Sequence, residues 1–328
     1  MRAPGSLALL FLSAALAAQV PPTPKITPAD AETLAAIEER AGKLERAIDQ
    51  LQRLGVRDPA LADVEVFLRA GRMIVKHGEF FKDSARQVVP VLDQGLLRAS
   101  QQMRGEAPWY GVAGQAVARG YRSRIDGTVQ PYAVTFPHDY GLDKRKRYRV
   151  DVVLHGRDPG MTEVSFLYRH RGVTAAPKDL SHVRIDIFGR GNNAYRWAGE
   201  ADVFEAVQNF FEVEAFLGRA GFVDRSRVVL RGYSMGGAGT WHIGLHRPDQ
   251  WVVLGPGAGF TTTHGYVAKL PERLAPYQEA CLHIYDAADY AENVFNVPVV
   301  AYGLGRRTRR SRSRRGPSSR CSSRWACR

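Results

Sequence analysis

The feature that most restricts the fold of this 328-residue chain is an alternation of short apolar runs with helical segments after residue 120. The runs are rich in Val, Ile and Leu, which is typical of strands buried on both faces of a parallel sheet. Apolar strands that alternate with helices indicate parallel β-α units. We therefore predict an α/β domain over residues 116–303, with a mostly parallel sheet and helices on both of its faces. The expected strands are 121–125, 129–137, 148–154, 183–188, 227–232, 251–255 and 297–302, and the expected helices are 198–217 and 235–246.

A small helical region is expected before this domain, over residues 18–115. Thr27 and Pro28 are a favourable N-cap and first residue for a helix. Two further helices are expected, one after Asp58-Pro59 and one over 84–103. His77 is a lone histidine there, and we expect it to be structural. The first helix carries apolar residues at steps of three and four, namely Leu34, Ile37, Ala41, Leu44, Ile48 and Leu51.

The first 17 residues have the pattern of a secretory signal peptide. Arg2 precedes an apolar run over 7–17, which ends in the small-residue cleavage pattern Ala15-Leu16-Ala17. A run of about eleven residues is too short to anchor a protein in a bilayer. We therefore expect a secreted or periplasmic protein without a membrane anchor. Because Cys281 is the one cysteine outside the last 25 residues, no disulfide is expected within the fold.

The net charge of +13 is concentrated at the end of the sequence. Ten arginines and no acidic residue lie within residues 305–328, so residues 1–304 carry a net charge of only +3. We therefore expect no nucleic-acid partner for the body of the protein. The segment 304–328 has two interpretations: a cationic arm that binds nucleic acid or anionic surfaces, or a disordered product of translation out of frame from near codon 304. The abrupt change in composition favours the second.

The motif with the clearest chemistry is Gly232-Tyr233-Ser234-Met235-Gly236, which matches G-x-S-x-G. It lies directly after an expected strand and directly before an expected helix. In this context the serine occupies a sharp strand-to-helix turn that exposes its hydroxyl above the sheet, and the glycines allow the backbone to approach closely. Ser234 is therefore the predicted nucleophile.

A second element, His155-Gly156-Arg157, follows the expected strand 148–154. In a sheet of this layout, the loop after the third strand supplies one backbone N–H of an oxyanion hole, and the residue after the nucleophile supplies the other. The predicted donors are Met235 together with Gly156 or Arg157. His155 itself is explained by its place in this loop.

Residues 121–303 resemble the α/β-hydrolases. The run GYSMGGAGTWHIGLHRPDQW (232–251) is similar to prolyl-oligopeptidase-like and feruloyl-esterase-like serine hydrolases, and GRGNNAYRWAGEADVFEAV (189–207) is similar to the peptidase-like branch. The resemblance implies a Ser-His-Asp triad, an acyl-enzyme intermediate, a peptide or ester substrate, and no metal or cofactor. It also implies an acid after the strand 297–302 and a histidine after one further strand.

Residues 303–328 contain no Asp, Glu or His, so we expect the hydrolase domain to lack its last strand, the triad acid and the triad base. His264 is a possible base, and Asp286 and Asp289 are possible acids. His242 and His246 have metal-ligand spacing on one helix. Because we expect no Glu or third ligand beside them, structural or solvent-facing roles are expected for both.

Two functions follow from these features. The first is a serine hydrolase, peptidase-like or alternatively a feruloyl-esterase-like carboxylesterase, with its turnover impaired by the missing triad partners. The second is a non-catalytic binding protein that retains the fold and the pocket.

Overall fold

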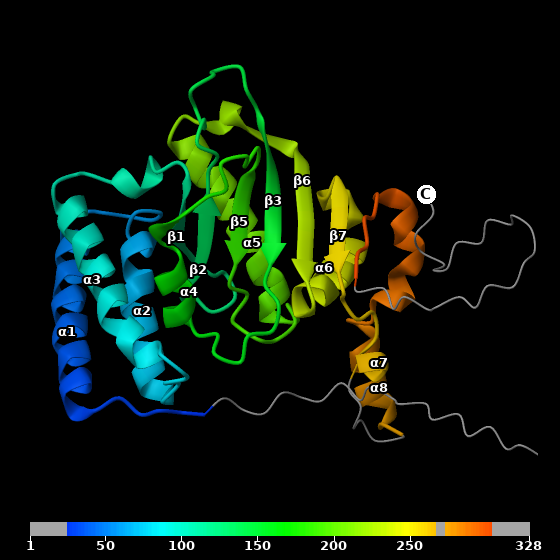
Figure 1. The fold of residues 1–328 in the computed structure, drawn as a ribbon, viewed down its shortest axis with the longest axis horizontal. Helices are drawn as coiled ribbons and strands as arrows, with labels where there is room; N and C mark the ends of the chain where they lie inside the picture. Colours follow the sequence, from blue (N-terminus) through cyan, green and yellow to red (C-terminus); the bar gives the residue numbers. More distant parts are fainter. Residues whose placement is uncertain (1–24, 267–272, 304–328) are drawn as a thin grey trace, which may run out of the picture.

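The computed structural model describes residues 25–266 and 273–303 (Figure 1). The predicted signal peptide and the arginine-rich segment 304–328 lie outside the described residues. None of the helices within the described ranges combines the length and apolar character needed to cross a bilayer.

Three amphipathic helices form the N-terminal region: α1 (Ala31–Arg53), α2 (Ala62–His77) and α3 (Ser84–Met103). The predicted apolar stripe of α1 is buried from Ile37 to Leu51, whereas Leu34 is exposed. The prediction that Thr27 is the N-cap of the first helix is wrong. The N–H of Thr27 donates to the Phe80 carbonyl oxygen at 2.8 Å, which holds this residue in an extended segment. The N-cap is Asp30, whose carboxylate accepts from the N–H of Thr33 at 2.7 Å.

The helical region is joined to the sheet by buried hydrogen bonds. Asp63, at the start of α2, accepts from the N–H of Gly120 at 2.7 Å and from Nε1 of Trp109 at 2.9 Å. Arg98 of α3 donates to the carbonyl oxygens of Asp63 and Ala118 at 3.1 and 2.8 Å. Because buried polar groups are costly unless they are paired, these contacts fix α2 and α3 against the first strand of the sheet.

The sheet has the strand order β4-β1-β2-β5-β3-β6-β7. Strands β5, β3, β6 and β7 run parallel, and β1 and β2 extend this core as an antiparallel pair. β4 pairs antiparallel with β1 at the edge and was not predicted. The predicted α/β class is confirmed as a mixed sheet. The strands are β1 (Gln115–Arg122), β2 (Val129–Thr135), β3 (Tyr148–Leu154), β4 (Arg171–Ala175), β5 (Val183–Ile187), β6 (Val223–Tyr233) and β7 (Val253–Gly257).

The segment 297–302, predicted to be a strand, lies beside β7 and pairs with it through two isolated parallel bridges, at Val299 and Tyr302. The N–H of Val300 donates to the carbonyl oxygen of Leu254 at 2.8 Å, and the N–H of Tyr302 donates to that of Pro256 at 3.2 Å. The backbone therefore continues the parallel core next to β7 without forming a regular strand.

Helices lie on both faces of the sheet. α5 (Ala198–Phe216) and α6 (Met235–His246) bury their apolar residues against one face, together with Val150, Val152 and Leu154 of β3. α4 (Glu163–Arg169) lies on the other face with α2, over β1 and β2. The remaining short elements are η1 (Pro108–Tyr110), η2 (Ala220–Phe222), η3 (Pro248–Gln250), α7 (Thr263–Tyr266), α8 (Pro276–His283) and η4 (Ala287–Asn296).

Helices lie on both faces of the sheet as predicted, but the cover opposite α5 and α6 does not extend over the central strands. Over β3, β5 and β6 the face opposite α5 and α6 carries ion-paired side chains, and Figure 1 shows no described helix in front of them. Asp151 accepts from Nε of Arg149 at 2.7 Å and from Nε of Arg231 at 2.9 Å, and Arg184 pairs with Asp186. These charged side chains pair with one another on this face. A helix packed there would instead require apolar side chains on the strands.

We expect Asp63→Ala to lower the free energy of unfolding by about 3 kcal/mol, because it leaves the Gly120 N–H and the Trp109 indole N–H buried without an acceptor. Urea denaturation followed by circular dichroism measures the change. The matched control is Asp93→Ala, which removes an exposed ion pair with Arg40 and should change stability by less than about 1 kcal/mol. Equal effects of the two substitutions would contradict the role given to Asp63.

Candidate active site

Ser234 lies in the turn between β6 and α6 with φ 56° and ψ −117°. A positive φ is strained for a residue with a side chain and persists only where the surrounding structure enforces it. Here the N–H of Ser234 donates to the Gly257 carbonyl oxygen at 2.8 Å, and the Ser234 carbonyl oxygen accepts from the N–H of Ala238 at 3.0 Å. The predicted strand–turn–helix context is therefore present, and the serine is half-buried at its apex.

The two glycines of the motif let the start of α6 touch the ends of two strands. A Cβ on Gly236 would overlap the carbonyl oxygen of Leu154 at the end of β3, and a Cβ on Gly232 would overlap that of Gly236. Both separations, from the added Cβ to the carbonyl oxygen, are well under 3.0 Å, and real Cβ atoms essentially never come so close to another atom. No larger residue fits at either position without moving backbone.

The loop after β3 lies beside Ser234. A Cβ built on Gly156 would lie 3.7 Å from Cβ of Ser234 and 3.2 Å from the carbonyl oxygen of Tyr233. Within the described part of the chain, no acceptor is found for the backbone N–H of Gly156, Arg157 or Met235. The structure thus brings the loop of the predicted oxyanion donors to Ser234 and leaves their N–H groups unpaired.

The His155 side chain is held within its own loop, as expected. Its Nδ1 lies 2.9 Å from the carbonyl oxygen of Gly156, and its Nε2 lies 3.0 Å from that of Phe188. The hydroxyl of Tyr195 accepts the His155 backbone N–H. The ring therefore supports the loop and is not free to serve Ser234 as a base.

No imidazole is hydrogen-bonded to Ser234, although all nine histidines of the chain lie among the described residues. His264, the candidate base, instead contacts Glu279, with Nε2 2.7 Å from Oε1. Both of these side chains are more than a third exposed to solvent. The structure therefore does not bring the predicted base candidate onto the hydroxyl.

The two candidate acids are also engaged elsewhere. The Asp286 carboxylate is buried and accepts from the N–H and the hydroxyl of Thr263 at 2.8 and 3.0 Å, so it anchors the segment that carries α7. Asp289 pairs with His283, and this hydrogen bond raises the pKa of His283. Neither carboxylate orients an imidazole toward Ser234.

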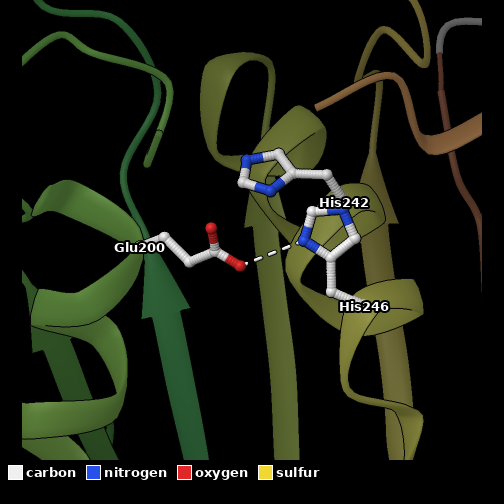
Figure 2. A group of neighbouring side chains, drawn as sticks. All are labelled: Glu200, His242 and His246. Carbon is white, nitrogen blue, oxygen red and sulfur yellow. Dashed lines mark hydrogen bonds and ion pairs between the residues drawn. The ribbon is translucent and has the colours of Figure 1, made fainter. Parts of the chain in front are cut away.

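The expectation that no Glu sits beside His242 and His246 is wrong. Glu200, near the start of α5, places Oε1 3.0 Å from Nδ1 of His246, and one ligand atom from each of the three residues lies within 4.8 Å of the others (Figure 2). Burial lowers the pKa of His242 to about 4, so its ring is neutral at physiological pH. Sequence spacing missed Glu200 because the contact is made by packing α5 against α6.

A pocket of about 500 Å³ borders the loop after β3. It lies between α2, α4 and the loop after β5, and Arg157 is part of its wall. Glu163 also lines it, with Arg69 at 3.1 Å. Burial outweighs this ion pair and raises the pKa of Glu163 to about 7. The other polar residues of the wall are His77, Glu79, Gln130, Thr162, Arg190 and Asn192.

No family model matches the sequence, and no curated protein matches it. Solved structures similar to the chain include FphF, a fluorophosphonate-binding serine hydrolase of Staphylococcus aureus, at 15% identity over 58% of this chain and 80% of that one, with a TM-score of 0.39. An acylaminoacyl peptidase of Pyrococcus horikoshii is 14% identical over 58% of this chain and 32% of its own, with a TM-score of 0.42. A ferulic acid esterase is 17% identical over 56% and 77%, with a TM-score of 0.37. The match thus spans about a third of the length of the peptidase.

We expect Gly236→Ala to destabilise the protein by about 2–3 kcal/mol, because the new methyl group meets the backbone at Leu154 and the turn must shift. Thermal and urea unfolding measure the loss. Gly221→Ala is the matched control, since a Cβ there meets no atom within 4 Å and should change stability by less than about 1 kcal/mol. A Gly236 variant as stable as the control would refute the close contact.

The raised pKa of Glu163 predicts that stability falls as pH rises. The folded state keeps the proton up to about pH 7, whereas the unfolded state releases it near the ordinary pKa of 4.5. The stabilisation is therefore complete below pH 4.5 and lost by pH 7. The loss amounts to at most about 3 kcal/mol. Glu163→Gln should make the midpoint of urea denaturation less dependent on pH between pH 4.5 and 7. Glu39→Gln, an exposed control, should leave this pH dependence unchanged. An unchanged pH slope in Glu163→Gln would contradict the assignment.

Proposed function

We propose that this chain is an exported serine hydrolase of the prolyl-oligopeptidase-like kind, in which Ser234 attacks a peptide or ester carbonyl. The observation that carries the proposal is the strained backbone of Ser234 at the β6–α6 turn, with Gly156 beside it. A strained serine that is presented to solvent by surrounding backbone is typical of a nucleophile, because such strain is costly and is retained where it serves function. Export would depend on residues 1–17.

In the proposed reaction, Oγ of Ser234 bonds to the carbonyl carbon, and the carbonyl oxygen takes up the negative charge. The N–H of Met235 and that of Gly156 or Arg157 would donate to this oxygen, and the positive end of α6 adds to their field. The leaving alcohol or amine departs with a proton, and water then attacks the acyl-Ser234 ester to release the acid and restore the hydroxyl. Loss of one oxyanion donor typically costs about 3 kcal/mol in the barrier.

The pocket beside Arg157 supports a polar substrate. Three arginines, Arg69, Arg157 and Arg190, and the carboxyl of Glu163 contribute to its wall. Peptides offer both carbonyl acceptors and N–H donors to such a surface. The polar wall and the resemblance of residues 189–207 together favour a peptidase-like function. A carboxylesterase is the alternative.

We further propose that turnover is impaired in this chain. Ser234 must transfer its proton as it attacks, and no imidazole is hydrogen-bonded to it among the described residues. In enzymes with a triad, removal of one member lowers turnover by about 10⁴ to 10⁶ and leaves the residual catalysis of the oxyanion hole. The same observation favours the second candidate function, a non-catalytic protein that binds peptides or esters in this pocket.

Added imidazole should restore acylation if Ser234 is a nucleophile that lacks its base. We expect hydrolysis of a p-nitrophenyl ester by the 328-residue protein to rise with imidazole concentration, beyond the rate of imidazole alone, and a mass shift of the acyl group on the peptide that contains Ser234. Without imidazole, Ser234→Ala should change the rate by less than about tenfold, because the members of a triad act as a unit.

Ser226→Ala is the matched control, since Ser226 lies on the same strand and its hydroxyl donates to Asp224 at 2.6 Å. If rescue is equal in Ser234→Ala and in the unsubstituted protein, Ser234 is not the nucleophile and the hydrolase proposal fails. If Ser234→Ala costs 10⁴-fold without imidazole, a histidine already serves it, and the proposed impairment fails. Peptide amides and feruloyl esters compared under rescue then separate the two branches.

A further inference from the structure

We propose that Glu200, His242 and His246 form a binding site for a divalent transition-metal ion, with Zn²⁺ as the best match. The site joins the start of α5 to α6 and lies away from the nucleophile. His242 and His246 are eight and twelve residues after Ser234, about 12 and 18 Å along the helix. The proposal therefore does not depend on the hydrolase function.

The three side chains converge from two helices. His242 and His246 are four residues apart on α6, so they share one face of the helix, and Glu200 reaches them from the first turn of α5 (Figure 2). One ligand atom from each lies within 4.8 Å of the others. Zinc–nitrogen bonds of 2.0–2.1 Å require neighbouring ligands to be about 3.3 Å apart in a tetrahedron. A shift of the side chains by about 1 Å brings the ligand atoms to this separation.

The His242 ring is oriented as a metal ligand would be. Its Nε2 lies 3.0 Å from the carbonyl oxygen of Ala194, an acceptor, so Nε2 carries the proton and Nδ1 carries a lone pair. Nδ1 is buried and has no hydrogen-bond partner in the described part of the chain. A second hydrogen bond that fixes the tautomer and leaves the other nitrogen bare is the usual support of a metal-binding histidine.

An ion pair between Glu200 and His246 explains only part of the cluster. It satisfies Nδ1 of His246 at 3.0 Å, but it leaves Nδ1 of His242 and Nε2 of His246 buried and unpaired within the described residues. Buried polar atoms without a partner are rare and costly, and two of them in one cluster require an explanation. A cation bound among the three residues supplies the partner that Nδ1 of His242 lacks.

The surroundings allow an ion to enter and to keep a water ligand. The Glu200 and His246 side chains remain 22% and 15% exposed, while His242 is buried. The ring centroid of Tyr285 lies 5.3 Å from that of His242, and the ring centroid of Tyr290 lies 4.5 Å from that of His246. These two tyrosines form a wall of the site. Two imidazoles and one carboxylate, without a thiol or thioether, suit Zn²⁺, Co²⁺ or Ni²⁺ rather than Cu⁺ or Ca²⁺.

Cobalt provides a direct spectroscopic test. The full chain, stripped with a chelator, should bind one Co²⁺ with visible d–d absorption bands and without a thiolate charge-transfer band, and Zn²⁺ should abolish these bands. The absence of the thiolate band separates this site from binding to the cysteines of the chain. Isothermal titration with Zn²⁺ gives the affinity, which should fall at least tenfold in Glu200→Gln and in His246→Gln.

His264→Gln is the matched control, because it removes an exposed histidine that contacts a single glutamate, Glu279. It should leave the Zn²⁺ affinity unchanged. Added Zn²⁺ should also raise the midpoint of thermal unfolding in the unsubstituted protein and in the control, and raise it less in the two cluster variants. Because Glu200→Gln preserves the size of the side chain, it remains informative if the histidine variant fails to fold.

The absence of Co²⁺ bands at millimolar metal would overturn the proposal. So would bands and Zn²⁺ affinity that are equal in Glu200→Gln and in the unsubstituted protein. Neither result bears on Ser234, and failure of imidazole rescue does not bear on the metal.

Discussion

The contact between the first turn of α6 and the ends of β3 and β6 is the constraint on which the rest of the candidate active site depends. Gly236 rests against the carbonyl oxygen of Leu154, and Gly232 rests against that of Gly236. This approach leaves no room for a relaxed backbone at Ser234, which takes a positive φ as a result. Because β3 ends at the same point, its following loop, with Gly156, is brought to the serine without a long connection. The position of Ser234 and that of the loop with Gly156 thus both follow from one packing contact.

The arrangement of helices on the sheet explains what else the chain brings together. α5 and α6 share one face, so a carboxylate near the start of α5 meets two histidines on α6. On the opposite face, Arg149, Asp151 and Arg231 pair with one another over the central strands. Over the central strands the two faces therefore differ: one buries apolar surface and holds the histidines, and the other is stabilised by charge pairing.

The sequence predicts features that are local in the chain, and it fails where distant segments decide. The limits of β3 and α6 follow from a Val-rich run and a strand-to-helix glycine motif, and Ser234 follows with them. β4 has no apolar run, because it is an exposed edge strand, and it could not be found in this way. Glu200 was missed because only the packing of α5 on α6 makes it a neighbour of His246. Thr27 has the residue type of a helix cap, but its N–H pairs with the distant Phe80, and the residues near Thr27 do not reveal this contact.

The two ends of α6 offer opposite electrostatic environments, and each proposed site lies at the end whose sign suits it. Unpaired N–H groups give the N-terminal end of a helix a partial positive charge, and unpaired carbonyl groups give the C-terminal end a partial negative charge. Ser234, where an anionic oxygen would develop, lies at the first end, and His246 is the last residue of the helix. A cation held by His242, His246 and Glu200 is favoured by the second end, just as an oxyanion is by the first. The proposed oxyanion and the proposed cation thus lie at opposite ends of one helix of twelve residues, each at the end whose partial charge favours it.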